Sequence, residues 1–403
     1  MTLAQFHQEL HKLLYIEDEG LVDIIMAGIV ANSLKLGDPV WMTLIGPSSG
    51  GKSQIIRPLT KAADGLIHRL DDLTPNTFIS GSLGIENSFL GRMGNHGIIS
   101  MDDLTVLFSK NAEARGEILS QFRMIYDGRF SKSSGNRKEA MVWPVNGERG
   151  YVGVISGSTP SIYRFLAEVA DMGERFVNYR MKATDMHKMA DFINKNTVPS
   201  QELDDKLADL YKTFLTPLIQ DPKSWQYTPL SDGVKQTISH IAEFTTLLRT
   251  PVHIDERSGL VDDFPEVEGP GRIMKQLTYM AQGLQIINRG PLTPELIHTL
   301  EWSAWSLAND KRRAYVKAII RLDYQRDKIT AKNISAISGL HRDIVKKGLD
   351  QFQALKIITL KADDHGEYEW ELACRPLKDI VMRLDPPDLS INMDELSYET
   401  STN

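Results

Sequence analysis

Gly46-Pro47-Ser48-Ser49-Gly50-Gly51-Lys52-Ser53 forms a glycine-rich segment between an apolar run at residues 40–45 and a helical pattern at residues 54–59. This order predicts a strand, a tight turn and the start of a helix. Glycines in such a turn let backbone N–H groups close around phosphate oxygens, and the start of a helix favours an anion. The context favours phosphate binding by all eight residues over an incidental glycine turn.

The spacing G-x-x-x-x-G-K-S is that of a P-loop, and it assigns roles to the last two residues. Lys52 is expected to reach the β- and γ-phosphates of a nucleotide, and the Ser53 hydroxyl is expected to ligate Mg²⁺. We therefore predict that ATP and Mg²⁺ are the cofactors of this protein.

A second candidate element is the apolar run at residues 98–101, which ends in two adjacent carboxylates, Asp102 and Asp103. A strand with this ending, at this distance after a P-loop, matches a Walker B motif. Asp102 would hold Mg²⁺, mostly through water, and Asp103 would polarise the attacking water. The alternative is a buried strand with a polar end. Asp103 also stands where most such ATPases have Glu, which leaves the general base open.

The composition is that of a folded protein, since 41% hydrophobic and 25% charged residues argue against wholesale disorder. A formal net charge of −7 means that any contact with nucleic acid must come from local basic patches. The single Cys374 excludes a disulfide framework and a cysteine-based zinc site. His7 and His11 have the spacing of a zinc helix but lack the adjacent Glu, so a solvated helix face is expected.

The N-terminus has no signal-peptide pattern, and the best apolar run, at residues 24–31, is too short to span a bilayer. We therefore expect a cytoplasmic protein with no membrane partner.

The apolar pattern changes several times along the 403 residues, which suffice for two or three domains. Short apolar runs around the P-loop predict the sheet of an α/β core, with strands at residues 40–45, 66–70, 97–101, 151–156 and 176–181. Long helical periodicity follows, and the end of the chain is acidic and short of apolar residues. The expected divisions are N-terminal helices at 1–34, a P-loop core at 35–197, a helical subdomain at 198–320, a winged-helix domain at 321–384 and a disordered acidic tail at 385–403.

The winged helix is predicted from a helix, a turn at Gly339 and a second helix over residues 329–347, followed by strand-like runs at 357–361 and 368–372. Residues 321–384 hold twelve Lys/Arg against ten Asp/Glu, and winged helices bind either DNA or proteins. A DNA contact is expected, and a protein contact stays open. On the second helix the residues expected to face inward are Ile344, Val345, Leu349, Phe352 and Leu355, and those expected to face outward and contact DNA are Arg342, Lys346 and Lys347.

Further motifs resemble those of the AAA+ ATPases. After Asp103 come a helical stretch at 117–124, a hairpin-like segment from Ile125 to Lys132 followed by a Ser-Gly-Asn-Arg turn, and a strand-like run from Tyr151 to Pro160 that contains Thr159. Gly173-Glu174-Arg175-Phe176 then resembles an arginine-finger motif, and residues 269–277, which include Arg272, resemble a sensor-2 helix. The order of these motifs is similar to that in minichromosome maintenance helicases, and shorter ATPases of this type look common in phages and other mobile elements.

The resemblance implies a role for three of these residues. Thr159 would be the sensor-1 residue at the γ-phosphate, and Arg272 would be the sensor-2 arginine. Arg175 would be a finger that acts on the nucleotide of a neighbouring subunit, because a planar guanidinium can hold two phosphate oxygens as charge develops. Such a finger requires a ring or a filament of this chain, and we expect a homo-oligomeric ring, for example a hexamer. The alternatives are a salt bridge of Arg175 with Glu174 or Asp171, and an ordinary helix-start arginine at position 272.

The hairpin region carries four cations, Arg129, Lys132, Arg137 and Lys138, among serines and a glycine. In a ring such a hairpin would contact the phosphates of single-stranded DNA in the channel. A solvated loop explains the charge pattern equally well.

These motifs predict an α/β P-loop ATPase core of the AAA+ class, with a helical lid at residues 198–320 and a C-terminal winged helix. We expect an oligomeric, ATP-hydrolysing DNA motor, a replicative helicase or replication initiator of a phage or mobile element, which acts on DNA with other replication proteins. The alternative is an ATP-dependent switch, a helicase loader or regulator, that binds DNA or a partner without translocating. Small-molecule phosphoryl transfer is disfavoured because no acceptor site is recognisable and the two arginines would have no role.

Overall fold

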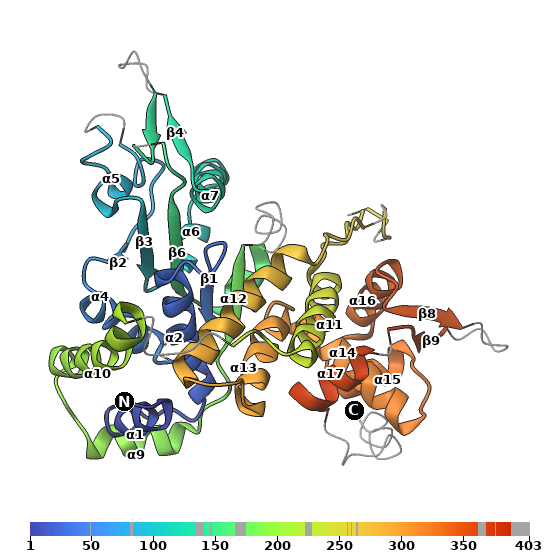
Figure 1. Cartoon of the computed structure of the whole chain (residues 1–403). Helices are drawn as coiled ribbons and strands as arrows, with labels where there is room; N and C mark the ends of the chain where they lie inside the picture. The colour runs from blue at the N-terminus through green and yellow to red at the C-terminus, as the bar shows by residue number, and fades with distance from the viewer. Residues whose placement is uncertain are drawn as a thin grey trace. The chain divides into compact units, whose positions relative to one another are not determined.

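Five parallel strands form the central sheet, in the order β2-β3-β6-β1-β7 (Figure 1). The strand that precedes the P-loop, β1, pairs with β6 on one side and with β7 on the other, so β6 separates β1 from β3. All five strands predicted from the apolar runs are confirmed. Their bounds are Trp41–Ile45 for β1, Ile67–Arg69 for β2, His96–Met101 for β3, Tyr151–Ser158 for β6 and Phe176–Arg180 for β7.

The computed structural model describes residues 1–48, 50–80, 84–133, 140–145, 147–165, 175–221, 228–255, 257–258, 260–262, 265–361, 368–374 and 376–387. These residues divide into two compact units. The first comprises the described parts of Met1–Ile238 and Gly271–Ser306, and the second those of Ser239–Pro270 and Leu307–Asn403. No helix in the described part of the chain combines the length and the apolar character that crossing a membrane requires.

One face of the sheet is covered by α2 (Glu19–Ser33), in which residues 21–32 are all buried. A helix that is apolar on every side needs a partner on every side. The strands β1, β3 and β6 cover one side, and the other sides are covered by α12 (Gly271–Asn288), α13 (Pro294–Trp305) and α10 (Ser200–Gln220). The two helices approach closely at Gly283, where a Cβ would overlap with the backbone carbonyl of Ala27. One face of strand β1 is therefore covered by α2, a helix that precedes it in the chain.

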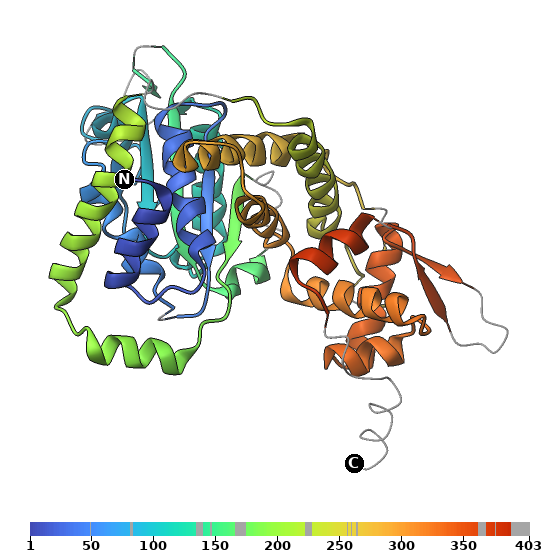
Figure 2. The same ribbon diagram turned by 60° about the horizontal axis from the view of Figure 1, so that its bottom comes forward.

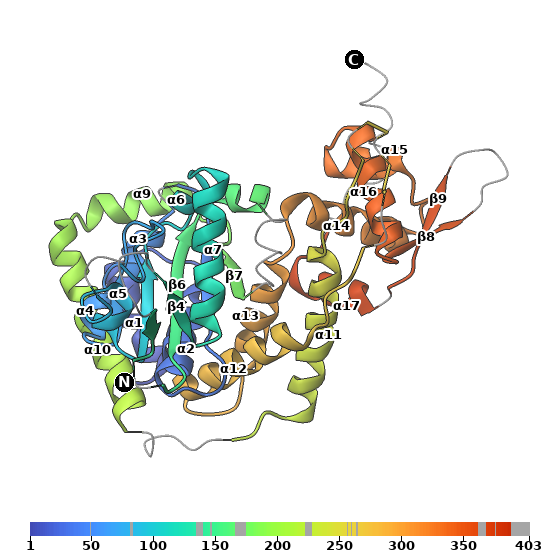
Figure 3. The same ribbon diagram turned by 90° about the horizontal axis from the view of Figure 1, so that it is seen from above.

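The opposite face of the sheet carries α7 (Ala112–Tyr126), which runs alongside β6 (Figure 3). Trp41 of β1 is the central side chain there, with edge-on contacts to Phe122 at 5.5 Å and to Tyr126 at 5.2 Å between ring centroids. The indole N–H of Trp41 donates a hydrogen bond of 2.7 Å to the carbonyl of Val152, which satisfies the one polar atom of this buried ring. The helix is thus anchored to the strand that leads into the P-loop.

At the outer side of the first unit, α1 (Leu3–Leu13) lies beside α10 (Ser200–Gln220) (Figure 2). The rings of Phe6 and Phe214 stack at 4.4 Å and join these two helices. The remaining helices and strands of this unit are α3 (Lys52–Ile56), α4 (Leu59–Ala62), α5 (Phe89–Met93), α6 (Thr105–Phe108), β4 (Phe130–Lys132), β5 (Met141–Trp143), η1 (Pro160–Phe165) and α9 (Met186–Lys195).

The second unit contains the helix, turn, helix and hairpin predicted for residues 329–372, with Gly339 at a φ of +68° in the turn. A buried arginine, Arg312, joins its helices by donating hydrogen bonds to the carbonyls of Leu248 (2.6 Å) and Thr250 (2.7 Å) and to Gln351 (3.3 Å). Burial lowers the pKa of Arg312 to about 10. The elements are α14 (Asp310–Gln325), α15 (Ala331–Ser338), α16 (Arg342–Ala354), β8 (Ile358–Lys361), β9 (Glu369–Leu372) and α17 (Pro376–Leu384), while α11 (Asp232–Arg249) begins in the first unit.

The helices expected to form one subdomain at residues 198–320 are divided between the two units. Helices α10, α12 and α13 belong to the first unit, and α14 belongs to the second. Helical periodicity shows that a helix has an apolar face, but it does not show which element covers that face. The domain limits, the lid and the winged helix stay predictions, and most of the tail, from residue 388, lies outside the described residues.

Candidate functional site

The carboxyl ends of β1, β3 and β6 meet at one edge of the sheet, where loops of α/β proteins bind ligands. Two backbone hydrogen bonds join them: Gly46 N donates to Ser158 O at 3.1 Å, and Leu104 N donates to Gly157 O at 2.7 Å. The P-loop, the acidic pair after β3 and Thr159 after β6 are therefore brought together, as the sequence predicts.

The P-loop turns into α3 at Gly51, whose φ of +86° lies in the left-handed region that favours glycine. The ammonium group of Lys52 donates hydrogen bonds to the carbonyls of Gly46 (2.8 Å) and Pro47 (2.7 Å), and the residue is 8% exposed. Burial lowers the pKa of Lys52, and the negative charge of Asp103 opposes this shift. No described carboxylate forms an ion pair with Lys52, so its charge suits an anion. Ser49 lies outside the described residues.

Asp102 lies against the helix that follows the P-loop. Its Oδ2 accepts a hydrogen bond from Arg69 at 3.1 Å and lies 3.7 Å from Nε of Arg57. Arg57 follows Ser53 by one helical turn, with a hydrogen bond from Arg57 N to Ser53 O, so both residues share one helix face. Oδ1 of Asp102 is buried and has no hydrogen-bond partner among the described residues. An orphaned carboxylate oxygen next to the Ser53 face fits a hydrated Mg²⁺.

Asp103 is exposed, and it is connected to Thr159 through one intermediate residue. Its Oδ1 accepts a hydrogen bond of 2.8 Å from the backbone N–H of Thr105. The hydroxyl oxygen of Thr105 in turn accepts a 3.1 Å hydrogen bond from the backbone N–H of Thr159, and lies 3.1 Å from the hydroxyl of Ser158. Sequence reasoning did not single out Thr105, although a Thr two residues after an Asp is a recognisable local hydrogen-bonding pattern.

Gly157 controls how closely the Walker B segment approaches β6. A Cβ at this position would overlap with the backbone carbonyl oxygen of Asp102. Because that contact involves backbone on both sides, no side-chain rotation relieves it. The sequence contained the glycine, but its role depends on the pairing of β3 with β6.

Arg175 lies at the opposite edge of the sheet. It precedes β7, and the register pairs Phe176 with Trp41 at the start of β1, roughly 13 Å from the P-loop end of this strand. The guanidinium is buried and donates to both carboxylate oxygens of Asp127, at 3.2 and 3.4 Å. It also lies over the ring of Tyr126, 5.0 Å from the centroid. The two alternative partners considered for Arg175, at positions 171 and 174, lie outside the described residues.

Arg272 is the second residue of α12 and belongs to the same edge as Arg175. Burial raises the pKa of Tyr126, and the positive charges of Arg272 and Arg175 oppose this rise. Gln276, one turn along α12, donates hydrogen bonds to that hydroxyl at 3.3 Å and to the carbonyl of Arg175. The two arginines are thus brought together with each other and not with the P-loop of their own chain.

The candidate DNA contacts differ in their availability. Arg129 is exposed, but Lys132 donates hydrogen bonds of 2.7 Å to both the carbonyl of Pro75 and the side chain of Asn76. Strands β4 and β5 form the expected hairpin, while Arg137 and Lys138 lie outside the described residues. On α16 the cations Arg342, Lys346 and Lys347 are all exposed, as predicted.

The inward face of α16 is correct at four of five positions. Val345, Leu349, Phe352 and Leu355 are buried, whereas the expected inward position of Ile344 is wrong because 42% of it is exposed. Ile344 lies in the first turn of the helix, where Val345 is fully buried and the Tyr315 hydroxyl donates to the Ile344 carbonyl, so the Ile344 side chain lies outside the buried face.

Among the described residues no group of three or more His, Cys, Asp or Glu side chains could hold a metal ion by itself. A P-loop magnesium ion needs only one or two protein ligands, since phosphate and water supply the rest. The pair His7 and His11 binds Glu19 instead, at 3.2 and 2.8 Å. His7 is also 2.7 Å from Asp23 and mostly buried, so this helix face is not fully solvated as expected.

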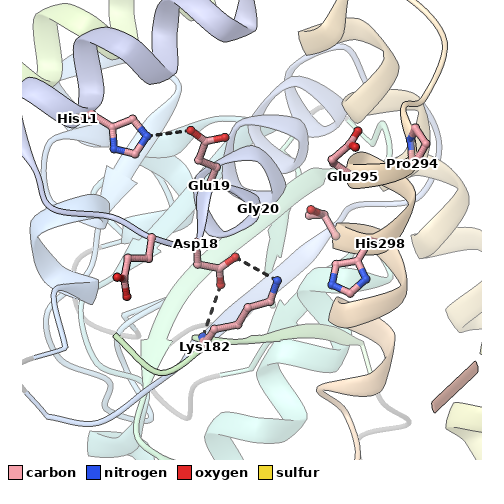
Figure 4. A pocket seen from close by; sticks show the side chains of 10 residues that line it. His11, Asp18, Glu19, Gly20, Lys182, Pro294, Glu295 and His298 are labelled. Atoms are coloured by element: carbon pink, nitrogen blue, oxygen red, sulfur yellow. Dashed lines mark hydrogen bonds and ion pairs between the residues drawn. The ribbon is translucent and has the colours of Figure 1, made fainter. Parts of the chain in front are cut away.

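A pocket of about 460 Å³ adjoins the same sheet edge, lined by ten residues of α1, α2, α13 and the loops beside them (Figure 4). Lys182 at its wall follows Met181, whose N–H donates to Ile45 O at the end of β1, and Lys182 faces Asp18 at 3.6 Å. Its lining includes four carboxylates, those of Glu17, Asp18, Glu19 and Glu295. This charge is unsuited to phosphate, so the pocket is distinct from the P-loop site.

No protein-family profile matches this chain. No curated protein has significant similarity to its sequence. A solved structure described as a "putative ATPase" from Cytophaga hutchinsonii is 13% identical, with a TM-score of 0.41, and the match covers 76% of this chain and 85% of that chain. A likeness with this identity and with a TM-score below 0.5 supports no argument about fold or function.

Gly157→Ala should weaken Mg²⁺-dependent nucleotide binding by about tenfold or more, because the added methyl group displaces the peptide of Asp102. Fluorescent-nucleotide titration with and without Mg²⁺ measures the change. Gly116→Ala is the control, since a Cβ there meets nothing within 4 Å. Equal binding by both variants would show that the approach of Asp102 to β6 does not matter to the site.

Proposed function

We propose that this protein binds ATP at the P-loop, residues 46–53, and hydrolyses it with Mg²⁺. The observation that carries the proposal is the convergence of Lys52, the pair Asp102 and Asp103, and Thr159 at one edge of the parallel sheet. A cation, two carboxylates and a hydroxyl at the end of a glycine loop are the groups that phosphoryl transfer to water requires.

We assign each side chain a role from its position in the site. Lys52 exchanges the carbonyls of Gly46 and Pro47 for phosphate oxygens, and Ser53 and Asp102 hold the metal ion. The bound Mg²⁺ supplies neutralisation of the charge on the phosphates. Asp103 is exposed and accepts only the Thr105 N–H among the described hydrogen bonds, which leaves its second oxygen able to accept a proton from water.

The position of the two arginines supports catalysis between subunits. Arg175 precedes β7, and Arg272 lies one helical turn before Gln276, which donates to the carbonyl of Arg175. Both arginines therefore lie at the edge opposite the P-loop, too far to contact phosphates bound by their own chain. A second copy that presents its P-loop to this edge would receive both charges. Asp127 neutralises Arg175 in the single chain, so phosphate from the neighbour competes with that carboxylate. A homo-oligomeric ring, for example a hexamer, satisfies this requirement for every subunit.

At the finer level, we propose an oligomeric AAA+ DNA motor resembling the minichromosome maintenance type, with the winged helix at residues 321–384 as a DNA contact. The exposed cations of α16 and the hairpin β4–β5 support this function. The alternative, an ATP-dependent switch such as a helicase loader or regulator, is supported by Lys132, which is already engaged by Pro75 and Asn76.

Lys52→Ala should abolish nucleotide binding and hydrolysis, because it removes the one cation inside the loop. The matched control is Lys61→Ala, a lysine on α4 whose partner is Asp205 on the surface. Calorimetric titration with ATP and phosphate release measure the two steps. Retention of full ATPase activity by Lys52→Ala would refute the site assignment.

Arg175→Ala should bind ATP normally but lose on the order of a thousandfold in hydrolysis rate, as loss of an arginine finger does. Mixing it with an Asp103→Asn variant should restore part of the activity, because some interfaces then combine an intact P-loop with an intact arginine. An Arg175→Ala and Lys52→Ala double variant mixed with Asp103→Asn provides the control that cannot be rescued. Failure of the first mixture to exceed this control would contradict action between subunits.

A DNA motor should hydrolyse ATP several-fold faster with single-stranded DNA and should displace an annealed oligonucleotide. Replacing Arg342, Lys346 and Lys347 together by Gln should lower the salt slope of DNA binding by up to about three, close to one per phosphate contact. The slope is measured by titration at several salt concentrations. Partner or DNA binding that depends on ATP without any strand displacement would favour the switch.

A further inference from the structure

Asp102 belongs to an ion-pair network with two arginines. Two guanidinium groups reach its Oδ2: Arg69 at the end of β2, at 3.1 Å, and Arg57 just after α3, at 3.7 Å. Asp102 is the only described carboxylate in contact with both of these arginines. Its partly buried position, with 21% of the side chain exposed, strengthens the attraction relative to a fully solvated pair.

Each of the two arginines also has a second carboxylate partner. Nε of Arg69 lies 2.6 Å from Asp71, and Nη1 of Arg57 lies 3.5 Å from Asp204 of α10. If Asp102 turns to another cation, neither guanidinium is therefore left without an acceptor. A guanidinium left without a carboxylate partner would be destabilised. Here each arginine keeps such a partner whether Asp102 binds it or binds a metal ion.

We propose that Arg69, assisted by Arg57, is a positioning residue that holds Asp102 in the nucleotide-free protein and opposes metal binding there until a triphosphate is present. This inference rests on the proposed nucleotide site. A divalent cation at Oδ1 of Asp102 shares the carboxylate with the Arg69 hydrogen bond at Oδ2 and is repelled by the two positive charges. A bound triphosphate adds negative charge next to the metal position. This charge attracts the cation and offsets its repulsion by the two arginines.

The test measures Mg²⁺ binding without nucleotide, by calorimetry and by the shift of the thermal midpoint with Mg²⁺ concentration. Arg69→Gln should bind Mg²⁺ about tenfold more tightly than the wild type, since it removes one competing charge. The double variant Arg69→Gln with Asp102→Asn should lose this gain. Lys61→Gln removes a nearby cation that does not touch Asp102, and its Mg²⁺ affinity should equal that of the wild type.

A second variant is designed to strengthen the pairing of Arg69 with Asp102 by a substitution at an exposed residue. Asp71 is an exposed residue, and Asp71→Asn leaves Arg69 with Asp102 as its remaining carboxylate partner among the described contacts. This variant should need several-fold more Mg²⁺ for the same nucleotide binding, while nucleotide binding in EDTA stays at the wild-type level. A role of Arg69 in folding alone would change both measurements together.

The outcomes separate the two proposals. Unchanged or weaker Mg²⁺ binding by Arg69→Gln, or a gain that survives Asp102→Asn, overturns the positioning role even if ATP binds normally. If no variant and no wild-type protein binds ATP, the nucleotide site fails, and the positioning role fails with it.

Discussion

Two hydrogen bonds at the end of β6 are the interactions on which the candidate site depends. Ser158 O receives the N–H of Gly46, and Gly157 O receives the N–H of Leu104. The P-loop and the acidic pair are thus each tied to the central strand and not directly to one another. In a parallel sheet, residues just before a strand lie at the edge formed by the amino ends of the strands, opposite the candidate site. Arg175 directly precedes β7, so it cannot belong to the site of its own chain.

The two charges of Lys52 and Asp102 at this edge differ in whether the structure gives them an ionic partner. Among the described residues Lys52 is paired only with neutral carbonyls, so its charge is available to an anion. Asp102 is paired with two guanidinium groups, so its charge is not freely available to a cation. Burial makes both arrangements energetically significant. Together they favour an order in which the triphosphate binds before, or together with, its metal ion.

Much of the fold and the core of the site could be predicted from the sequence, because strand, glycine turn and carboxylate pair are local patterns. The α/β P-loop-type core and its five strands were predictable in this way. The contact of Arg69 with Asp102, the anchoring of Lys132 by Pro75 and the division of the helices beyond α9 were not. The two contacts join residues that are far apart in sequence, and the division of the helices depends on which element covers each apolar face. Neither kind of information produces a periodic pattern in the sequence.

The return of α12 to α2 has a consequence for how the polypeptide is made. The first unit is discontinuous, and α2 lacks its contacts with α12 and α13 until Gly271–Ser306 has been synthesised. A nascent chain that ends before this segment exposes an almost wholly apolar helix next to the sheet, a surface prone to aggregation. Folding of the first unit during synthesis must therefore wait for a segment that lies far along the chain.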